Sequence, residues 1–303
     1  MNKSNIKPIW IYYLALGTVI LTWGLDPIIN SYFYKFFSAS LLCSICTFAS
    51  AVMFIILSFK DLKKINIDYI KIAVPICTLN ALANLFQRIG LQYTTPANYA
   101  FLEYLSVAVV PFALLVMTGK KPTFIQLIAS FICFCGCFVF SGASLSGFDI
   151  GIGEILCALA GVLGGICVSA TGVYVKKLDV KLYITIYMCI YFLTSLCMTV
   201  GLNNIKRDGV PLEKIKFVLN PSIIIILLFF GLFSVGICWL LRTEALKHIS
   251  PAKVVILNPF SAIITGVVSI IIGYDNISGR FVVGGILILV AALISSSEKL
   301  LKK

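Results

Sequence analysis

The sequence predicts an all-α integral membrane protein of ten transmembrane helices, arranged as two inverted five-helix repeats. Three observations support this fold class. The mean hydropathy is +1.04 and only 12% of the residues are charged, which is far from the composition of a water-soluble domain. The chain also divides into ten apolar segments, each long enough to cross a hydrocarbon core of about 30 Å. Finally, a stretch of the first half recurs in the second half.

Short charged or Gly- and Pro-containing links separate the apolar segments. Each segment is continuously apolar, whereas the strands of a membrane barrel would alternate over roughly ten residues. We therefore expect helices rather than strands. The expected helices span residues 9–30, 38–58, 70–91, 96–117, 123–144, 152–175, 182–200, 221–243, 251–272 and 280–297.

Residues 91–106 and 246–261 carry the recurring stretch, with five identities in sixteen positions at an offset of 155 residues. Each copy has a Pro-Ala pair where a polar link enters an apolar run, and a helix tolerates Pro in its first turn. The chain accordingly divides into a first repeat, residues 1–146, and a second repeat, residues 147–303. Because five helices separate the copies, the second repeat crosses the membrane in the opposite sense.

Lysine and arginine set the expected orientation. If the N-terminus is cytoplasmic, seventeen of the twenty-four basic residues fall at the cytoplasmic ends of the helices. Both termini are therefore expected in the cytoplasm. The net charge of +12 is spread over thin loops that face anionic lipid, so we expect the lipid bilayer, and no nucleic acid, as a partner.

Polar residues recur at spacings of three or four on several expected helices, which places them on one face of each helix. Such faces are expected to point into the bundle. Glu103 in the first repeat aligns with Asn258 in the second. The candidate residues for substrate binding or coupling are Asp26, Asn80, Asn84, Gln87, Arg88, Tyr99, Glu103, Tyr187 and Asn258.

Three charged side chains, Asp26, Arg88 and Glu103, lie well inside the expected helices. Each would cost roughly 2.5–3.5 kcal/mol at a helix centre on insertion scales. Arg88 and Glu103 either form a structural ion pair across neighbouring helices or act directly on a substrate. Asp26 has no obvious partner. We hypothesise that Asp26 or Glu103 couples protons or binds an ammonium group, with the asparagine and glutamine side chains supplying neutral hydrogen bonds.

The second repeat holds two further patterns. Gly161 and Gly165, with Ala160 and Gly164 beside them, favour close helix packing. Tyr187 and Tyr191 lie four residues apart and form either a cavity wall or part of the packing. Arg242 is expected near the cytoplasmic end of its helix, where a charge is inexpensive.

Other classes of protein fit less well. The eleven cysteines lie mostly in apolar runs and the single histidine, His248, lies at a helix end, so no metal or cofactor is expected. An enzyme would need a nucleophile with its base, or a metal constellation, at membrane depth. The alternative to a transporter is a non-transporting scaffold or receptor, which explains the glycine-rich helix but not the polar faces and the inverted repeat.

Several motifs resemble the drug/metabolite transporter superfamily, in its EamA-like branch: Trp23-Gly24, Gly90-Leu91-x4-Pro96-Ala97, Ala245-Leu246-x4-Pro251-Ala252 and Gly284-Gly285. This resemblance implies a plasma-membrane carrier, commonly an exporter of amino acids or related metabolites, with a central cavity between the halves. Inverted repeats with a site at their interface are typical of secondary transporters. The expected function is therefore secondary transport of a small polar metabolite, such as an amino acid or a related amine-bearing compound, by alternating access, with proton coupling as an option.

Overall fold

The structure is a computed structural model and describes residues 8–91, 93, 102–141, 151–204, 206–207, 210–211, 215–218, 220–272 and 279–297. Helices make up almost all of its secondary structure. Besides one small antiparallel hairpin, β1 (Lys206–Arg207) with β2 (Val210–Pro211), the elements are α1 (Ile9–Phe33), α2 (Ala39–Ser58), η2 (Leu62–Lys64), α3 (Ile67–Leu91), α5 (Leu105–Thr118), α6 (Phe124–Ser141), α7 (Ile152–Tyr174), η4 (Val175–Lys177), α8 (Val180–Asn204), α9 (Pro221–Phe230), η5 (Gly231–Ile237), α10 (Cys238–His248), α11 (Pro251–Leu257), α12 (Phe260–Ile271) and α13 (Gly279–Ser297).

The described helices are those of a multi-pass membrane protein. Seven helical segments are long and apolar enough to cross a membrane: Ile9–Asn30, Ala39–Ser58, Ile67–Gly90, Ile152–Lys177, Val180–Asn204, Pro221–His248 and Pro251–Val268. Three more apolar helices, within α5, α6 and α13, are shorter in the described part of the chain. Each of the ten expected spans thus contains a helix, and the number of complete crossings stays a prediction.

The helices of the second repeat differ from the sequence prediction in two places. The expected helix 221–243 contains a π-helical turn, η5, and continues to His248. The expected helix 251–272 is broken into α11 and α12 at Asn258 and Pro259. Proline has no backbone N–H to donate within the helix, which accounts for the break.

Contacts between α2 and α8 give the relative direction of two helices that occupy the same place in the two halves. Ser44 hydrogen-bonds to Thr199 at 3.0 Å, and Thr47 hydrogen-bonds to Ser195 at 3.2 Å. Further along α2, the Thr185 hydroxyl donates to the Ser58 hydroxyl at 3.0 Å. Residue numbers rise along α2 as they fall along α8, so the two helices run antiparallel.

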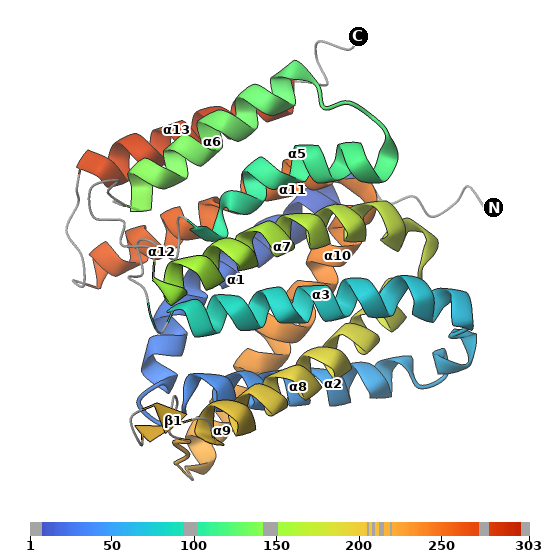
Figure 1. Cartoon of the computed structure of the whole chain (residues 1–303), viewed down its shortest axis with the longest axis vertical. Coiled ribbons are helices and arrows are strands. Elements are labelled where there is room, and N and C mark those ends of the chain that lie inside the picture. The colour runs from blue at the N-terminus through green and yellow to red at the C-terminus, as the bar shows by residue number, and fades with distance from the viewer. Residues whose placement is uncertain are drawn as a thin grey trace.

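The same exchange of halves recurs through the bundle. Figure 1 shows α6 beside α13 at the top and α2 beside α8 at the bottom, and each of these pairs joins one helix of the first half to one of the second. Likewise, α3 packs on α7 while α10 packs on α1. Two buried apolar clusters, one around α5, α6, α11 and α13 and the other around α2, α3 and α8, therefore both draw on each half of the chain.

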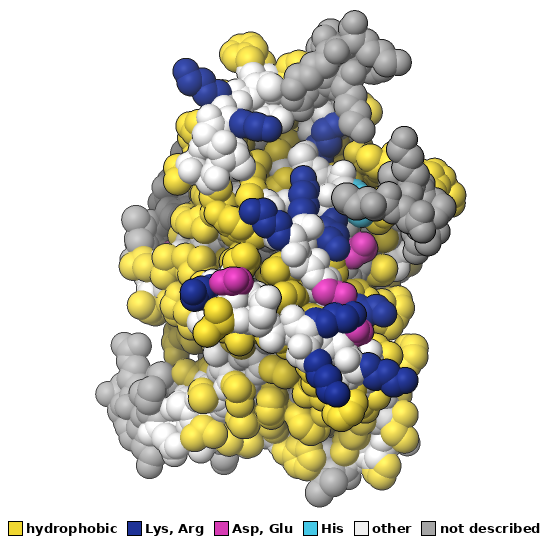
Figure 2. All heavy atoms as spheres, turned by 90° about the vertical axis from the view of Figure 1, so that its right-hand side faces the viewer, with side chains coloured by type: hydrophobic (Ala, Val, Ile, Leu, Met, Phe, Trp, Pro, Cys, Tyr) yellow, Lys and Arg dark blue, Asp and Glu magenta, His cyan; other side chains and the backbone are white. Residues whose placement is uncertain are grey.

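One end of the bundle is rich in lysine. Figure 2 looks onto the right-hand side of Figure 1 and shows many lysine and arginine side chains on it. The following lysines are exposed at helix ends: Lys60, Lys63, Lys64, Lys120, Lys121, Lys176, Lys177 and Lys181. The charge pattern of the sequence predicts that such an end faces the cytoplasm, and this orientation stays a prediction.

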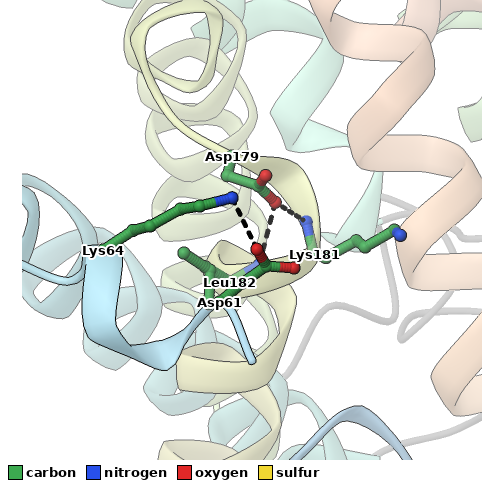
Figure 3. A network of polar contacts seen from close by, with 5 residues as sticks. All are labelled: Asp61, Lys64, Asp179, Lys181 and Leu182. Atoms are coloured by element: carbon green, nitrogen blue, oxygen red, sulfur yellow. Dashed lines mark hydrogen bonds and ion pairs between the residues drawn. The ribbon is translucent and has the colours of Figure 1, made fainter. Parts of the chain in front are cut away.

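A small polar network fixes the start of α8 on this lysine-rich end (Figure 3). The Asp179 carboxylate accepts hydrogen bonds from the backbone N–H groups of Lys181 and Leu182 at 2.9 and 3.3 Å, as a helix N-cap does. In the neighbouring link, Lys64 donates to Asp61, and this hydrogen bond holds the pKa of the Asp61 carboxyl below its usual value. The two carboxylates lie close together but have different structural roles, since only the Asp179 side chain caps a helix.

We expect Asp179→Ala to lower the free energy of unfolding by about 1 kcal/mol, because α8 loses its N-cap. Thermal denaturation of the purified protein in detergent measures the change. Asp61→Ala is the matched control, since it removes a carboxylate from the same network without uncapping a helix, and no measurable change is expected. Equal losses in the two variants would contradict the capping role.

Candidate functional site

Asp26 lies on α1 against the π-helical turn η5. The Ser234 hydroxyl lies 2.8 Å from Oδ1 and 2.7 Å from Oδ2 of Asp26 and donates its proton to the carboxylate. The indole N–H of Trp23 donates to the backbone oxygen of Ser234 at 3.3 Å. Single π-helical turns within α-helices are frequent at functional sites, because they shift the register of the side chains that follow. Here the turn presents Ser234 to α1.

Arg88, near the end of α3, is the cation that Asp26 faces. The Arg88 Nε donates a hydrogen bond to the Tyr191 hydroxyl on α8 at 3.3 Å. Arg88 and Asp26 attract each other electrostatically across a small cavity. The expectation that Asp26 lacks a partner is therefore wrong. The cavity is lined by Asp26, Asn30, Leu42, Cys43, Cys46, Arg88, Phe230 and Val235.

Glu103 has different partners from those predicted. Its carboxylate is hydrogen-bonded to the Gln87 side chain and lies in the field of Arg242. No ion pair joins Arg88 to Glu103, although the structure describes both residues. The interpretation of these two side chains as a structural ion pair is therefore wrong, because each carboxylate faces an arginine on another helix: Asp26 faces Arg88, and Glu103 faces Arg242.

Arg242 is a buried residue of the site that sequence reasoning missed. Arg242 is only 8% exposed. Its guanidinium carbon lies 5.5 Å from the ring centre of Trp23 and 5.0 Å from that of Trp239. Such distances are those of cation–π contacts. Arg242 was expected near the membrane surface because its helix was predicted to end at residue 243, but α10 continues to His248 and carries Arg242 into the bundle.

Aromatic rings connect the two arginines. The Tyr187 and Tyr191 rings stack at 5.6 Å, and Tyr187 lies 4.8 Å from Trp239. Both tyrosines are at most 2% exposed. Since Tyr191 binds Arg88 and Trp239 contacts Arg242, the tyrosines form a wall that runs from one guanidinium to the other.

The polar face of α3 meets this wall. Asn84 Nδ2 donates to the backbone oxygen of Asn80 at 2.8 Å and lies 3.4 Å from the Tyr187 hydroxyl. Asn80 itself is 7% exposed. Asn80, Asn84, Gln87 and Arg88 therefore all face the interior of the bundle, where α8 and Glu103 lie.

Asn258 lies at the break between α11 and α12. Its backbone oxygen accepts a hydrogen bond from the Ser261 hydroxyl at 2.8 Å. Its side-chain oxygen Oδ1 is buried and has no hydrogen-bond partner among the described residues. A buried acceptor without a donor costs free energy, so the Asn258 Oδ1 atom is available to accept a hydrogen bond from a ligand.

Comparison with known proteins assigns the family. The model of the EamA-like transporter family matches the sequence twice, over residues 9–142 and 155–297. The chain belongs to the EamA-like transporter family. It is therefore a multi-pass membrane transporter of the drug/metabolite type, and its two matched segments lie on either side of the predicted division between the repeats.

Solved structures agree with this EamA-like fold. One crystal structure of a protein superposes with a TM-score of 0.73 over 94% of this chain and 96% of that chain, at 14% sequence identity. At that identity the likeness concerns the fold alone. Among curated proteins, none matches the sequence.

The structure brings together most of the predicted site residues of this EamA-like transporter. Asp26 and Arg88 share one cavity, while Glu103, Gln87, Asn84 and Tyr187 lie along the neighbouring helix faces. Tyr99 lies outside the described residues. Within the part of the chain that the structure describes, no group of three His, Cys, Asp or Glu side chains is arranged to hold a metal ion.

Two residues of the site, Ser234 and Arg242, were not predicted. Ser234 carries no sequence signal, because the π-helical turn that presents it is not visible in the hydrophobic pattern. Arg242 does carry one, since the 155-residue offset of the repeat pairs it with Gln87, a predicted site residue.

Proposed function

We propose that this EamA-like chain is a secondary transporter of a small polar metabolite, such as an amino acid or a related amine-bearing compound, and that it works as an exporter by alternating access. The observation that carries the proposal is the placement of two carboxylates and two arginines inside the bundle. Asp26 faces Arg88 across a small cavity, and Glu103 lies in the field of Arg242. Asp26 and Arg88 both belong to the first half, whereas Glu103 and Arg242 belong to different halves. Buried charges in membrane helices are costly and mark substrate or ion pathways.

The proposed architecture is ten transmembrane helices in two inverted five-helix repeats, residues 1–146 and 147–303. The antiparallel contact of α2 with α8 supports it, because equivalent helices of inverted repeats run in opposite directions. Rocking one repeat against the other would then expose the site to each side in turn. The carboxylates Asp26 and Glu103 are the candidates for proton coupling.

The proposed location is the plasma membrane, with both termini in the cytoplasm. The lysine-rich end of the bundle supports this orientation, since positively charged residues concentrate on the cytoplasmic side (Figure 2).

The test is counterflow by the purified protein in proteoliposomes. Vesicles are loaded with one unlabelled compound of a panel of amino acids, amines and other polar metabolites, and uptake of the same labelled compound is followed. We expect transient accumulation of label for at least one compound, and none in protein-free vesicles. Stabilisation of the protein against heat by a panel compound, without counterflow of any, would favour the receptor instead.

A further inference from the structure

We propose that Arg242 and Asn258 form a subsite for a carboxylate group of the transported metabolite. The Arg242 guanidinium binds the carboxylate, and the Asn258 amide oxygen accepts a hydrogen bond from a donor next to it. This inference rests on the proposed transport function and adds the residues that select substrates by charge.

The Nε–H group of Arg242 is buried and lacks an acceptor among the described residues. A guanidinium has five N–H donors around the edge of a planar group. Trp23 and Trp239 contact Arg242 at cation–π distances, while Nε is buried and has no hydrogen-bond partner among the described residues. Ring contacts do not satisfy N–H donors. A carboxylate does so with two parallel hydrogen bonds, which is the geometry for which arginine is best suited.

Arg88 provides the contrast. It lies on α3 in the first half, next to the Gln87 position that the repeat pairs with Arg242, but it donates to the Tyr191 hydroxyl and shares a cavity with Asp26. Arg88 therefore already has an acceptor in the fold. Arg242 feels the charge of Glu103, but the two side chains are too far apart for an ion pair, and no ion pair of Arg242 occurs among the described residues.

Asn258 also has an unpartnered polar atom in the described part of the chain. Its Oδ1 is also buried without a partner in the described chain, at a point where Pro259 interrupts the helix. A buried donor and a buried acceptor without partners among the described residues thus both belong to the second repeat. A ligand that carries both an acidic group and a hydrogen-bond donor satisfies both of them.

The repeat explains why these two residues belong to one subsite. The 155-residue offset pairs Gln87 with Arg242 and Glu103 with Asn258. In the first repeat, Gln87 and Glu103 are hydrogen-bonded to each other. In the second repeat, no hydrogen bond joins the equivalent side chains in the described part of the chain, and Arg242 Nε and Asn258 Oδ1 each lack a partner there. The two side chains of the first repeat thus satisfy each other, whereas the equivalent side chains of the second repeat are available to a ligand.

The substrate side of the test uses wild-type protein in proteoliposomes. The probes are L-leucine, L-threonine and L-phenylalanine, each compared with its primary amide, which replaces the charged carboxylate with a neutral group of similar size. We expect counterflow of at least one amino acid to exceed that of its amide at least about 30-fold, as for a lost charge partner in a buried site. Equal counterflow of acids and amides, or counterflow restricted to compounds without a carboxylate, would overturn the subsite but leave the carrier intact. Absence of counterflow for the whole metabolite panel would overturn both.

The protein variants of the test are Arg242→Gln and Arg242→Lys. Lys247→Gln is the matched control, since it removes one positive charge from the C-terminal end of the same helix. We expect Arg242→Gln to reduce counterflow of the amino acid at least about 30-fold and Lys247→Gln to leave it unchanged. Arg242→Lys keeps the charge but not the planar fork and should fall between them.

Thermal stability separates a binding role from a structural one. Because Arg242 is a buried charge whose Nε has no hydrogen-bond partner among the described residues, its replacement by neutral glutamine should leave the midpoint of thermal unfolding unchanged or raise it. A marked fall of the midpoint, together with unaltered discrimination between acids and amides in the protein that remains folded, would assign Arg242 to the structure and overturn the subsite.

Discussion

Replacement of Asp26 by asparagine should abolish most of the transport activity, with a loss on the order of 100-fold in counterflow. The asparagine amide has the same shape and retains an oxygen that accepts from Ser234, so the contact between α1 and η5 survives. The negative charge is lost, however, and Arg88 is left in its cavity without the carboxylate that it faces. Loss of one member of a buried charge pair costs roughly 2–5 kcal/mol, which accounts for the expected size of the effect.

The measurement is counterflow in proteoliposomes, with and without an imposed pH gradient. Asp68→Asn is the control, since Asp68 is an exposed carboxylate at the start of α3. Glu103→Gln is measured alongside, because it removes the second buried carboxylate. If Asp26→Asn and Glu103→Gln both transported at the wild-type rate and with the wild-type response to the gradient, the carboxylates would have no part in the mechanism.

Addition of one methyl group to α7 should distinguish two glycines that look alike in the sequence. A Cβ atom on Gly161 would lie 2.2 Å from the backbone oxygen of Leu102, whereas a Cβ on Gly164 would meet nothing within 4 Å. Because a backbone oxygen cannot move aside cheaply, Gly161→Ala should destabilise the protein by about 3 kcal/mol or more. Gly164→Ala should be neutral or stabilise it by about 0.5–1 kcal/mol, since alanine favours the helix.

Thermal unfolding in detergent and the yield of monodisperse protein measure the two glycine variants. The opposite signs make the comparison sharp, since both changes add the same group to the same helix. Equal stability of Gly161→Ala and Gly164→Ala would contradict the close approach of α7 to the Leu102 end of α5.

This pair of glycines also shows which packing contacts can be predicted from the sequence and which cannot. The small residues of α7 correctly indicate close packing, because spacing places them on one face. Spacing alone does not say which of them meets a neighbour, since that depends on the path of another helix. Gly165 lies against Val109, whereas Gly164 has open space beside it.

In the candidate site, too, the sequence predicts which helix face is polar but not which residues that face contacts. The polar face of α3 was predictable, since helical periodicity brings Asn80, Asn84 and Gln87 to one side. The partners of the charged residues were not, because the predicted contact of neighbouring antiparallel helices suggested Arg88 with Glu103. In the fold, Asp26 on α1 faces Arg88 on α3, and Glu103 lies in the field of Arg242, which the extra residues of α10 carry inward.

The most direct test of the whole account is the membrane side of two equivalent links, the one between α2 and α3 and the one between α8 and α9. Single cysteines are introduced as Lys64→Cys and Lys216→Cys and labelled with a membrane-impermeant maleimide, and the signal of the wild-type cysteines is subtracted. Inverted repeats predict labelling of Lys216→Cys in intact cells and of Lys64→Cys only after the membrane is opened. Labelling of both cysteines from the same side would contradict the inverted arrangement and with it the proposed carrier.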